Sequence, residues 1–146
     1  MQIRVANILY ETMTDGPGFR TSIYSQGCNH HCNGCHNPQT WSPDGGKSYD
    51  VHKLYDIIVN EELSDVTFSG GDPMFQVEGF TELAKMVKNK TNKTIWCYTG
   101  YTYEQIKTIP DEFTTDFKSR LEDAVFAIMP SGFVITHVLI TAKPTL

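Results

Sequence analysis

The sequence predicts an α/β fold with mainly parallel strands, because strand-like segments alternate with amphipathic helical segments. Strand character is concentrated in residues 20–26, 65–69 and 93–98. Residues 80–87, between the second and third of these segments, carry apolar side chains on one helical face. A helix crossing between consecutive strands is typical of parallel pairing, and ligands then bind at the carboxyl ends of the strands.

The remaining segments complete this pattern. Residues 49–63 place apolar side chains at helical spacing, which predicts an amphipathic helix. Residues 27–48 are rich in Gly, Asn, Pro, Ser and Asp, so they predict a long structured loop. Short helices are predicted at residues 103–108 and 113–121, and a buried strand at residues 134–140. With no repeat or low-complexity linker, we expect residues 1–146 to form a single domain.

Composition narrows the class of protein. Of the 146 residues, 40% are hydrophobic and 20% are charged, as in ordinary globular proteins. No signal peptide or membrane-spanning stretch is evident, and four cysteines, three of them clustered, do not resemble a secreted disulfide scaffold. The formal net charge of −5 argues against nucleic-acid binding. We therefore expect a cytoplasmic protein that binds neither nucleic acid nor membrane.

The most informative motif is a cluster of three cysteines, Cys28, Cys32 and Cys35, with the spacing C-x3-C-x2-C. Thiolates this close together can converge on one metal centre. Iron–sulfur cubes held by cysteine normally use four thiolates. Three ligands would leave one iron open, much as a catalytic zinc keeps one position for its substrate. The count of three therefore indicates an enzyme site rather than a purely structural one.

A structural zinc site is the alternative interpretation, with His30, His31 or His36 as a fourth ligand. We favour it less, because structural zinc sites usually consist of two separated pairs and no second pair exists here. Cys97 stands alone in a strand-like segment and is predicted to be a small buried hydrophobic residue. The default interpretation of His30 and His31 is that they are solvated loop residues.

A second motif, Gly70-Gly71-Asp72-Pro73, directly follows a predicted strand. The glycines would let the backbone approach a ligand closely, and Asp72 could pair with a cationic amino group. Asp72 could equally cap the following helix, and both roles are compatible. The cysteine loop, this turn and residues 98–101 each follow a strand, so all three should meet at one sheet edge.

Together these pieces resemble the radical S-adenosylmethionine superfamily, specifically its activases for glycyl radical enzymes. The matching segments are 15–18 (DGPG), 26–28 (QGC), Cys32, 35–41 (CHNPQTW), 69–73 (SGGDP) and 98–101 (YTGY). Gly34, before the last cysteine, sharpens the likeness to the small activases of anaerobic ribonucleoside-triphosphate reductase. The resemblance implies a partial, open β/α barrel that admits a peptide of the partner.

The resemblance also implies cofactors and residue roles. Cys28, Cys32 and Cys35 would hold a [4Fe-4S] cluster whose fourth iron is chelated by S-adenosylmethionine. The residues implied to bind S-adenosylmethionine, beside Cys35, are Gly70, Gly71 and Asp72 at its methionyl amino end, and Gly34, His36 and Tyr98 nearer the cluster or adenosine. Reductive cleavage to methionine and a 5′-deoxyadenosyl radical would then generate a glycyl radical on the reductase.

The implied partners are anaerobic ribonucleoside-triphosphate reductase and an electron donor such as a flavodoxin. Activation of another glycyl radical enzyme, such as pyruvate formate-lyase, stays open. The resemblance covers about residues 1–121, and residues 122–146 depart from the family pattern.

Overall fold

The computed structural model describes residues 1–101, 125–127 and 137–139. The helices predicted at 103–108 and 113–121 lie outside the described residues. The elements within them are β1 (Gln2–Thr12), β2 (Arg20–Ser25), the 3-10 turn η1 (Pro38–Thr40), β3 (Lys47–Asp50), α1 (Val51–Asn60), β4 (Asp65–Gly70), the 3-10 turn η2 (Pro73–Gln76), α2 (Val77–Lys90), β5 (Ile95–Cys97), β6 (Val125–Ala127) and β7 (His137–Leu139).

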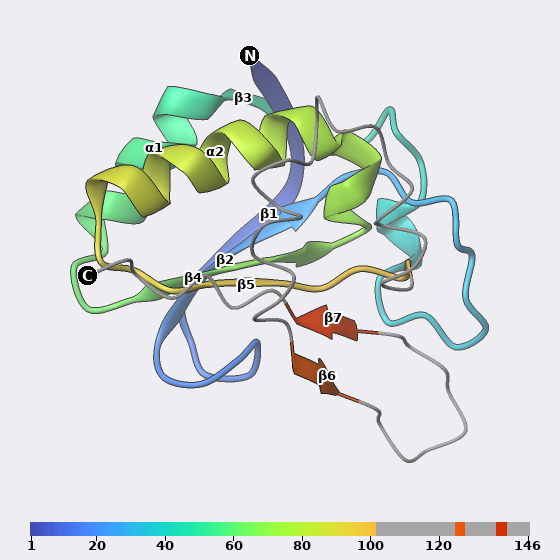
Figure 1. Cartoon of the computed structure of the whole chain (residues 1–146). Helices are drawn as coiled ribbons and strands as arrows, with labels where there is room; N and C mark the ends of the chain where they lie inside the picture. Colours follow the sequence, from blue (N-terminus) through green and yellow to red (C-terminus); the bar gives the residue numbers. More distant parts are fainter. Residues whose placement is uncertain (102–124, 128–136, 140–146) are drawn as a thin grey trace.

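A five-stranded open sheet in the order β3-β1-β2-β4-β5 forms the centre of the described structure (Figure 1). Strand β2 pairs in parallel with β4, and β4 pairs in parallel with β5. Strand β1 is antiparallel to both β2 and β3, and β6 and β7 form a separate antiparallel pair. The α/β prediction is therefore confirmed, but the sheet is mixed rather than mainly parallel. A direct loop joins β1 to β2, and such a connection suits antiparallel pairing.

Helices α1 and α2 lie on the same side of the sheet (Figure 1). Between the helices and the sheet, Phe68 of β4 packs edge-to-face on Phe80 of α2, with ring centroids 5.0 Å apart. Gly79 allows α2 to approach β1 closely, since a Cβ there would lie 2.6 Å from Ile3 Cγ1. The fully buried hydrophobic residues include Ile3, Ile23, Leu54, Ile58, Val66, Phe68, Phe80, Leu83 and Val87. This core covers one face of the sheet.

Both helices have boundaries that differ from the predicted ones, and for α1 the cause is strand pairing with β1. The predicted helix 49–63 begins only at Val51, because Tyr49 and Asp50 pair with β1 as the end of β3. Asp50 then caps the helix by accepting a hydrogen bond from the His52 backbone N–H at 2.9 Å. Helix α2 is longer than the predicted 80–87 segment.

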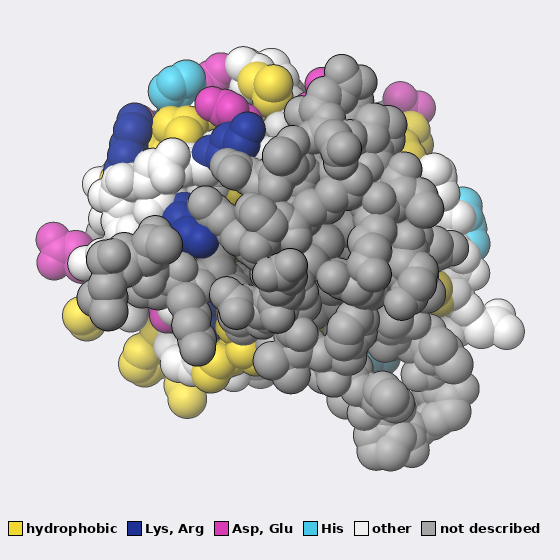
Figure 2. All heavy atoms as spheres, in the orientation of Figure 1, with side chains coloured by type: hydrophobic (Ala, Val, Ile, Leu, Met, Phe, Trp, Pro, Cys, Tyr) yellow, Lys and Arg dark blue, Asp and Glu magenta, His cyan; other side chains and the backbone are white. Residues whose placement is uncertain are grey.

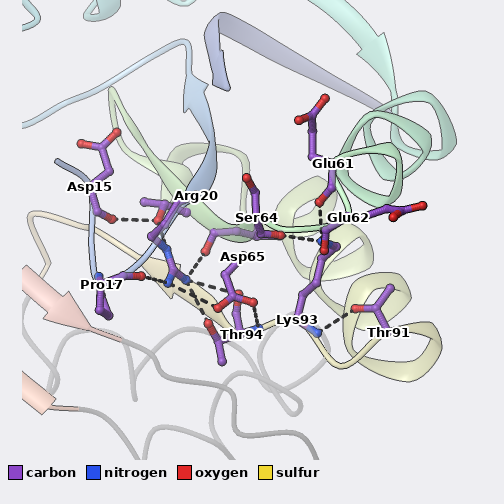
Figure 3. A network of polar contacts seen from close by, with 12 residues as sticks. Asp15, Pro17, Arg20, Glu61, Glu62, Ser64, Asp65, Thr91, Lys93 and Thr94 are labelled. Carbon is purple, nitrogen blue, oxygen red and sulfur yellow. Dashed lines mark hydrogen bonds and ion pairs between the residues drawn. The ribbon is translucent and has the colours of Figure 1, made fainter. Parts of the chain in front are cut away.

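A buried arginine holds the turn at residues 15–18 against the sheet (Figure 3). Arg20 is 0% exposed and donates from Nη1 to Pro17 O at 3.0 Å and from Nε to Thr67 Oγ1 at 2.7 Å. The Thr67 hydroxyl donates in turn to Asp15 O at 2.8 Å. Arg20 Nη2 donates to Val66 O at 2.7 Å. These bonds join the turn, β2 and β4 into one unit.

The surface carries both hydrophobic and charged groups. Figure 2 shows hydrophobic side chains at the lower left, where Figure 1 draws the loop between β1 and β2. Large hydrophobic residues exposed in or beside that loop include Leu9, Tyr10, Met13 and Phe19.

Among the helices in the described ranges, none combines the length and apolar character that a membrane crossing needs.

Candidate metal and cofactor site

Two loops that leave neighbouring parallel strands form the base of the site. Ser25 at the end of β2 pairs with Gly70 at the end of β4, and hydrogen bonding continues beyond the strands. Gly71 N donates to Ser25 O at 2.8 Å, and Asp72 N donates to Gly27 O at 3.0 Å. Gly70 has φ +94°, and a Cβ there would lie 2.6 Å from Ser25 N. The cysteine loop (residues 27–41) and the turn at residues 70–73, which we call the glycine turn, are therefore joined by their backbones.

The cysteine loop is anchored where it starts and where it returns. Gly27 N donates to Thr40 O at 2.7 Å, and Cys28 N donates to Trp41 O at 3.2 Å. The side chain of Gln26 adds a bond from Nε2 to Ser42 O at 2.6 Å. Residues 27–41 thus form a closed loop at the carboxyl end of β2.

All the residues predicted to bind a metal or cofactor line one cavity of about 260 Å³. They are Cys28, Cys32, Gly34, Cys35, His36, Gly70, Gly71, Asp72 and Tyr98. His30, Trp41, Thr99 and Gly100 line it as well. The structure therefore brings together motifs that are up to 72 positions apart in the chain, from Cys28 to Gly100.

Cys28, Cys32 and Cys35, which we call the cluster cysteines, are free thiols. Burial raises the pKa of the Cys28 thiol, a backbone hydrogen bond at His30 opposes this, and Asp72, Cys32 and Cys35 raise the pKa further. This mutual repulsion of thiolates on one cavity wall would be relieved by a cationic metal centre. Within the described ranges, no three His, Cys, Asp or Glu side chains are grouped so that they could hold a single metal ion.

The donor set of the cavity fits an iron–sulfur cluster. Three free thiols from one loop face the cavity, which matches cluster ligation by cysteine. Trp41 also lines the cavity. Its Nε1 is buried and donates no hydrogen bond to any of the described residues. A donor of this kind would suit a sulfide or thiolate acceptor.

Asp72 is 2% exposed, and protein groups occupy both of its carboxylate oxygens. Oδ1 accepts from Met74 N at 2.8 Å, which caps η2 as the sequence suggested. Oδ2 accepts from Thr99 Oγ1 at 2.8 Å and from Gly100 N at 2.9 Å. Oδ2 also lies 2.7 Å from His30 Nε2. The carboxylate therefore ties the glycine turn to two other segments.

His30 is the site residue that sequence reasoning missed. The expectation of a solvated loop residue is wrong, because its side chain is only 20% exposed and contacts Asp72. The hydrogen bond to Asp72 raises the pKa of His30, against the effect of burial. Its ring also packs edge-to-face on Tyr101, with centroids 4.6 Å apart. His31 is exposed as expected, although its ring lies against Trp41.

Two further residues have clear positions. Cys97 is fully buried in β5, which confirms the prediction of a buried hydrophobic residue. Burial raises its pKa well above the usual value. Tyr98 follows directly and lines the cavity, and burial also raises its pKa. Cys97, the last residue of β5, thus packs in the core, and the next residue, Tyr98, lines the cavity.

Comparison with known proteins gives consistent matches. Residues 14–128 match the family described as "4Fe-4S single cluster domain", a match that extends past residue 121, where the sequence resemblance was expected to end. An anaerobic ribonucleoside-triphosphate reductase-activating protein of Enterobacteria phage T4 is 32% identical over 101 residues, covering 65% of each chain. The Vibrio cholerae protein of the same name is 35% identical over 104 residues, covering 64% of this chain and 66% of the relative.

A pyruvate formate-lyase-activating enzyme of Clostridium pasteurianum is 32% identical over 138 residues, covering 88% of this chain and 58% of the relative. The chain thus spans between 58% and 66% of the length of these three relatives. The expected resemblance to activases is confirmed by these three relatives, which are named as activating proteins or enzymes. The chain belongs to the 4Fe-4S single cluster domain family.

Proposed function

We propose that this protein is a radical S-adenosylmethionine activase that generates a glycyl radical on anaerobic ribonucleoside-triphosphate reductase. The observation that carries the proposal is that one cavity of about 260 Å³ is lined by the cluster cysteines, by Gly70 and Gly71, and by residues 98–100. Similarity to activating proteins of that reductase supports the choice of partner. An electron donor such as a flavodoxin and a cytoplasmic location belong to the same proposal.

In this proposal the cluster cysteines hold a [4Fe-4S] cluster with one open iron. When bound, the reduced cluster supplies the electron that cleaves S-adenosylmethionine to methionine and a 5′-deoxyadenosyl radical. Gly70, Gly71 and Asp72 line the methionyl amino end, and Gly34, His36 and Tyr98 lie nearer the cluster or adenosine, with Cys35 beside them. Because protein donors occupy Asp72, we expect backbone groups of the glycine turn to meet the methionyl amino group.

In this proposal the open fold gives a peptide of the partner access to this cavity. We propose one domain over residues 1–146 that forms a partial, open β/α barrel. Among the described residues the sheet is open and carries α1 and α2 on one face (Figure 1), and in this proposal the reductase peptide approaches the cavity from the side away from these helices. The residue to be attacked would be a backbone glycine of the partner.

Anaerobic reconstitution with iron and sulfide tests the cofactor assignment. We expect about four iron and four sulfide per chain. We also expect an EPR signal of the reduced cluster that changes when S-adenosylmethionine is added. A colourless protein that retains stoichiometric zinc and takes up no iron or sulfide would instead establish the structural zinc site.

Pyruvate formate-lyase is the second candidate partner. It is favoured by the match to the Clostridium pasteurianum enzyme, which covers 88% of this chain. Incubation of the reduced, loaded protein and S-adenosylmethionine with each candidate separates the two. A glycyl radical EPR signal on the reductase and none on the lyase supports the first proposal, and the reverse pattern replaces it with the second.

A further inference from the structure

The cysteine loop is fastened to the opposite wall of the cavity by a side chain from its own interior. His30 lies between two cluster cysteines in sequence, and its Nε2 is 2.7 Å from Asp72 Oδ2. The same oxygen accepts hydrogen bonds from Thr99 Oγ1 and Gly100 N. One carboxylate oxygen therefore joins the cysteine loop, the glycine turn and the turn after β5.

This contact adds a constraint that the backbone does not supply. The backbone bond from Asp72 N to Gly27 O fixes only the start of the cysteine loop. His30 acts further along the loop, where Cys32 is exposed and where the ladder from β2 no longer holds the chain. The edge-to-face contact with Tyr101 restricts the imidazole from a second side. The loop is thus held at His30 as well as at its start and its return.

We propose that His30 is a positioning residue that sets the cysteine loop, and hence the cluster, at a fixed separation from the glycine turn that receives S-adenosylmethionine. The inference rests on the proposed function for the identity of the two ligands. His30 acts through Asp72 and the loop backbone rather than on a reacting atom. Loss of the contact would leave all three thiols in the protein, but the part of the cysteine loop that carries them would become more mobile.

The chain offers a matched control in the next residue. His31 contacts Trp41 and forms a 3.3 Å hydrogen bond from Nδ1 to Asn29 O, so its contacts stay within the loop and its return. His31 has φ +47°, a conformation that Asn tolerates, which makes His31→Asn a suitable replacement. A general loss of loop stability would affect both histidine variants, whereas the proposed positioning role concerns His30 alone.

Gly100 offers a second way to break the same contact. A Cβ on Gly100 would lie 2.7 Å from His30 Cδ2 and 2.8 Å from His30 Nε2. Gly100→Ala should therefore push the imidazole away from Asp72 while His30 itself stays in the sequence. His30→Gln is the conservative variant, because its amide N–H can reach towards the position of Nε2.

The test uses the full chain and two measurements. In the cluster-free protein, hydrogen exchange of amides 28–36 should be about tenfold faster in His30→Ala and Gly100→Ala than in the wild type, as for loss of a buried hydrogen bond. In the reconstituted protein, titration of S-adenosylmethionine followed by EPR of the reduced cluster should give about tenfold weaker binding in both variants. His30→Gln should recover most of each loss, and His31→Asn should stay within about twofold of the wild type.

Different outcomes separate this inference from the proposed function. Absence of a cluster, or of an EPR response to S-adenosylmethionine, in the wild type refutes the proposed function, and exchange in the cluster-free chain still tests the contact. Unchanged exchange and unchanged binding in His30→Ala overturn the positioning role. An equal loss in His31→Asn also overturns it. If His30→Ala fails to hold iron while His30→Gln holds it, the positioning role is supported.

Discussion

Replacement of Arg20 by Met tests whether the buried guanidinium stabilises the contact of the turn at residues 15–18 with β2 and β4. Arg20 is completely buried and donates to the Pro17 and Val66 carbonyls and to the Thr67 hydroxyl at 2.7–3.0 Å. Burial lowers its pKa, and Asp65 and Tyr98 oppose that change. Met has a similar length but no donor, so these three acceptors would lose the hydrogen bonds shown in Figure 3, as would the Thr94 carbonyl and hydroxyl, which accept from Nη2 at 3.2 Å.

The expected loss follows from these contacts. A hydrogen bond from a charged donor contributes about 1.5 kcal/mol or more, so the three bonds of 2.7–3.0 Å give roughly 5 kcal/mol, and the two longer bonds to Thr94 add less. Removing the guanidinium also recovers part of the free energy spent on its desolvation. Asp65 is 38% exposed and can be solvated without its partner, so it adds little to the loss. We therefore expect Arg20→Met to lower the free energy of unfolding by about 3 kcal/mol.

Urea unfolding of the reduced, metal-free chain measures this loss. Trp96 fluorescence reports locally, because the Arg20 guanidinium lies 5.4 Å from the Trp96 ring centroid. Arg4→Met is the matched control, since Arg4 also donates to two carbonyls but is exposed, and it should cost less than about 1 kcal/mol. A loss below about 1 kcal/mol in Arg20→Met, or equal losses in the two variants, would refute the reasoning.

Three further predictions concern the site and its surroundings. Replacement of any one cluster cysteine by Ala should abolish iron and sulfide uptake, whereas Cys97→Ser should retain both; iron analysis after anaerobic reconstitution decides. Gly71→Ala should weaken S-adenosylmethionine binding at least tenfold, because its Cβ would lie 2.5 Å from Gly27 O; unchanged binding by EPR titration would contradict this. Burial keeps Cys97 protonated after an unfolded-state thiol ionises near pH 9.0, so the cluster-free chain should lose stability above that pH. The slope from this group is at most about 1.4 kcal/mol per pH unit, and urea titrations of Cys97→Ala should show it reduced.

The site was largely predictable because its motifs follow neighbouring parallel strands of the sheet. The carboxyl ends of parallel strands meet at one edge, so residues after β2, β4 and β5 had to converge once these strands were recognised. The local order of Gly70, Gly71 and Asp72 was also informative: the Asp72 cap is a short-range feature, and paired glycines mark a point where another backbone segment can come close. The structure places these residues together, and their roles towards a cofactor stay predictions.

Other features left no local signal. Strand β1 is 11 residues long, but its apolar residues alternate only over Ile3 and Val5, so no regular strand pattern extends along its full length. Strand β3 lies at the end of a loop-like segment and exists through pairing with β1. The burial of Arg20 and the contact of His30 depend on partners more than 40 positions away. Single-sequence patterns describe neighbours on one element, so contacts of this range are not visible in them.

The backbone junction between the two loops has a consequence for which sequence changes the cavity can absorb. Gly71 N to Ser25 O and Asp72 N to Gly27 O extend the β2–β4 ladder one step past each strand. The spacing of the two loops at this point is therefore the spacing of neighbouring strands, about 4.8 Å, whatever side chains surround it. A residue inserted at 26–27 or at 70–71 would shift one loop against the other, whereas an insertion near residues 42–45 would disturb hydrogen bonds of Gln26 and Arg4 but would leave this junction in place. Length at these two junctions is thus more tightly constrained than residue type across most of the cavity wall.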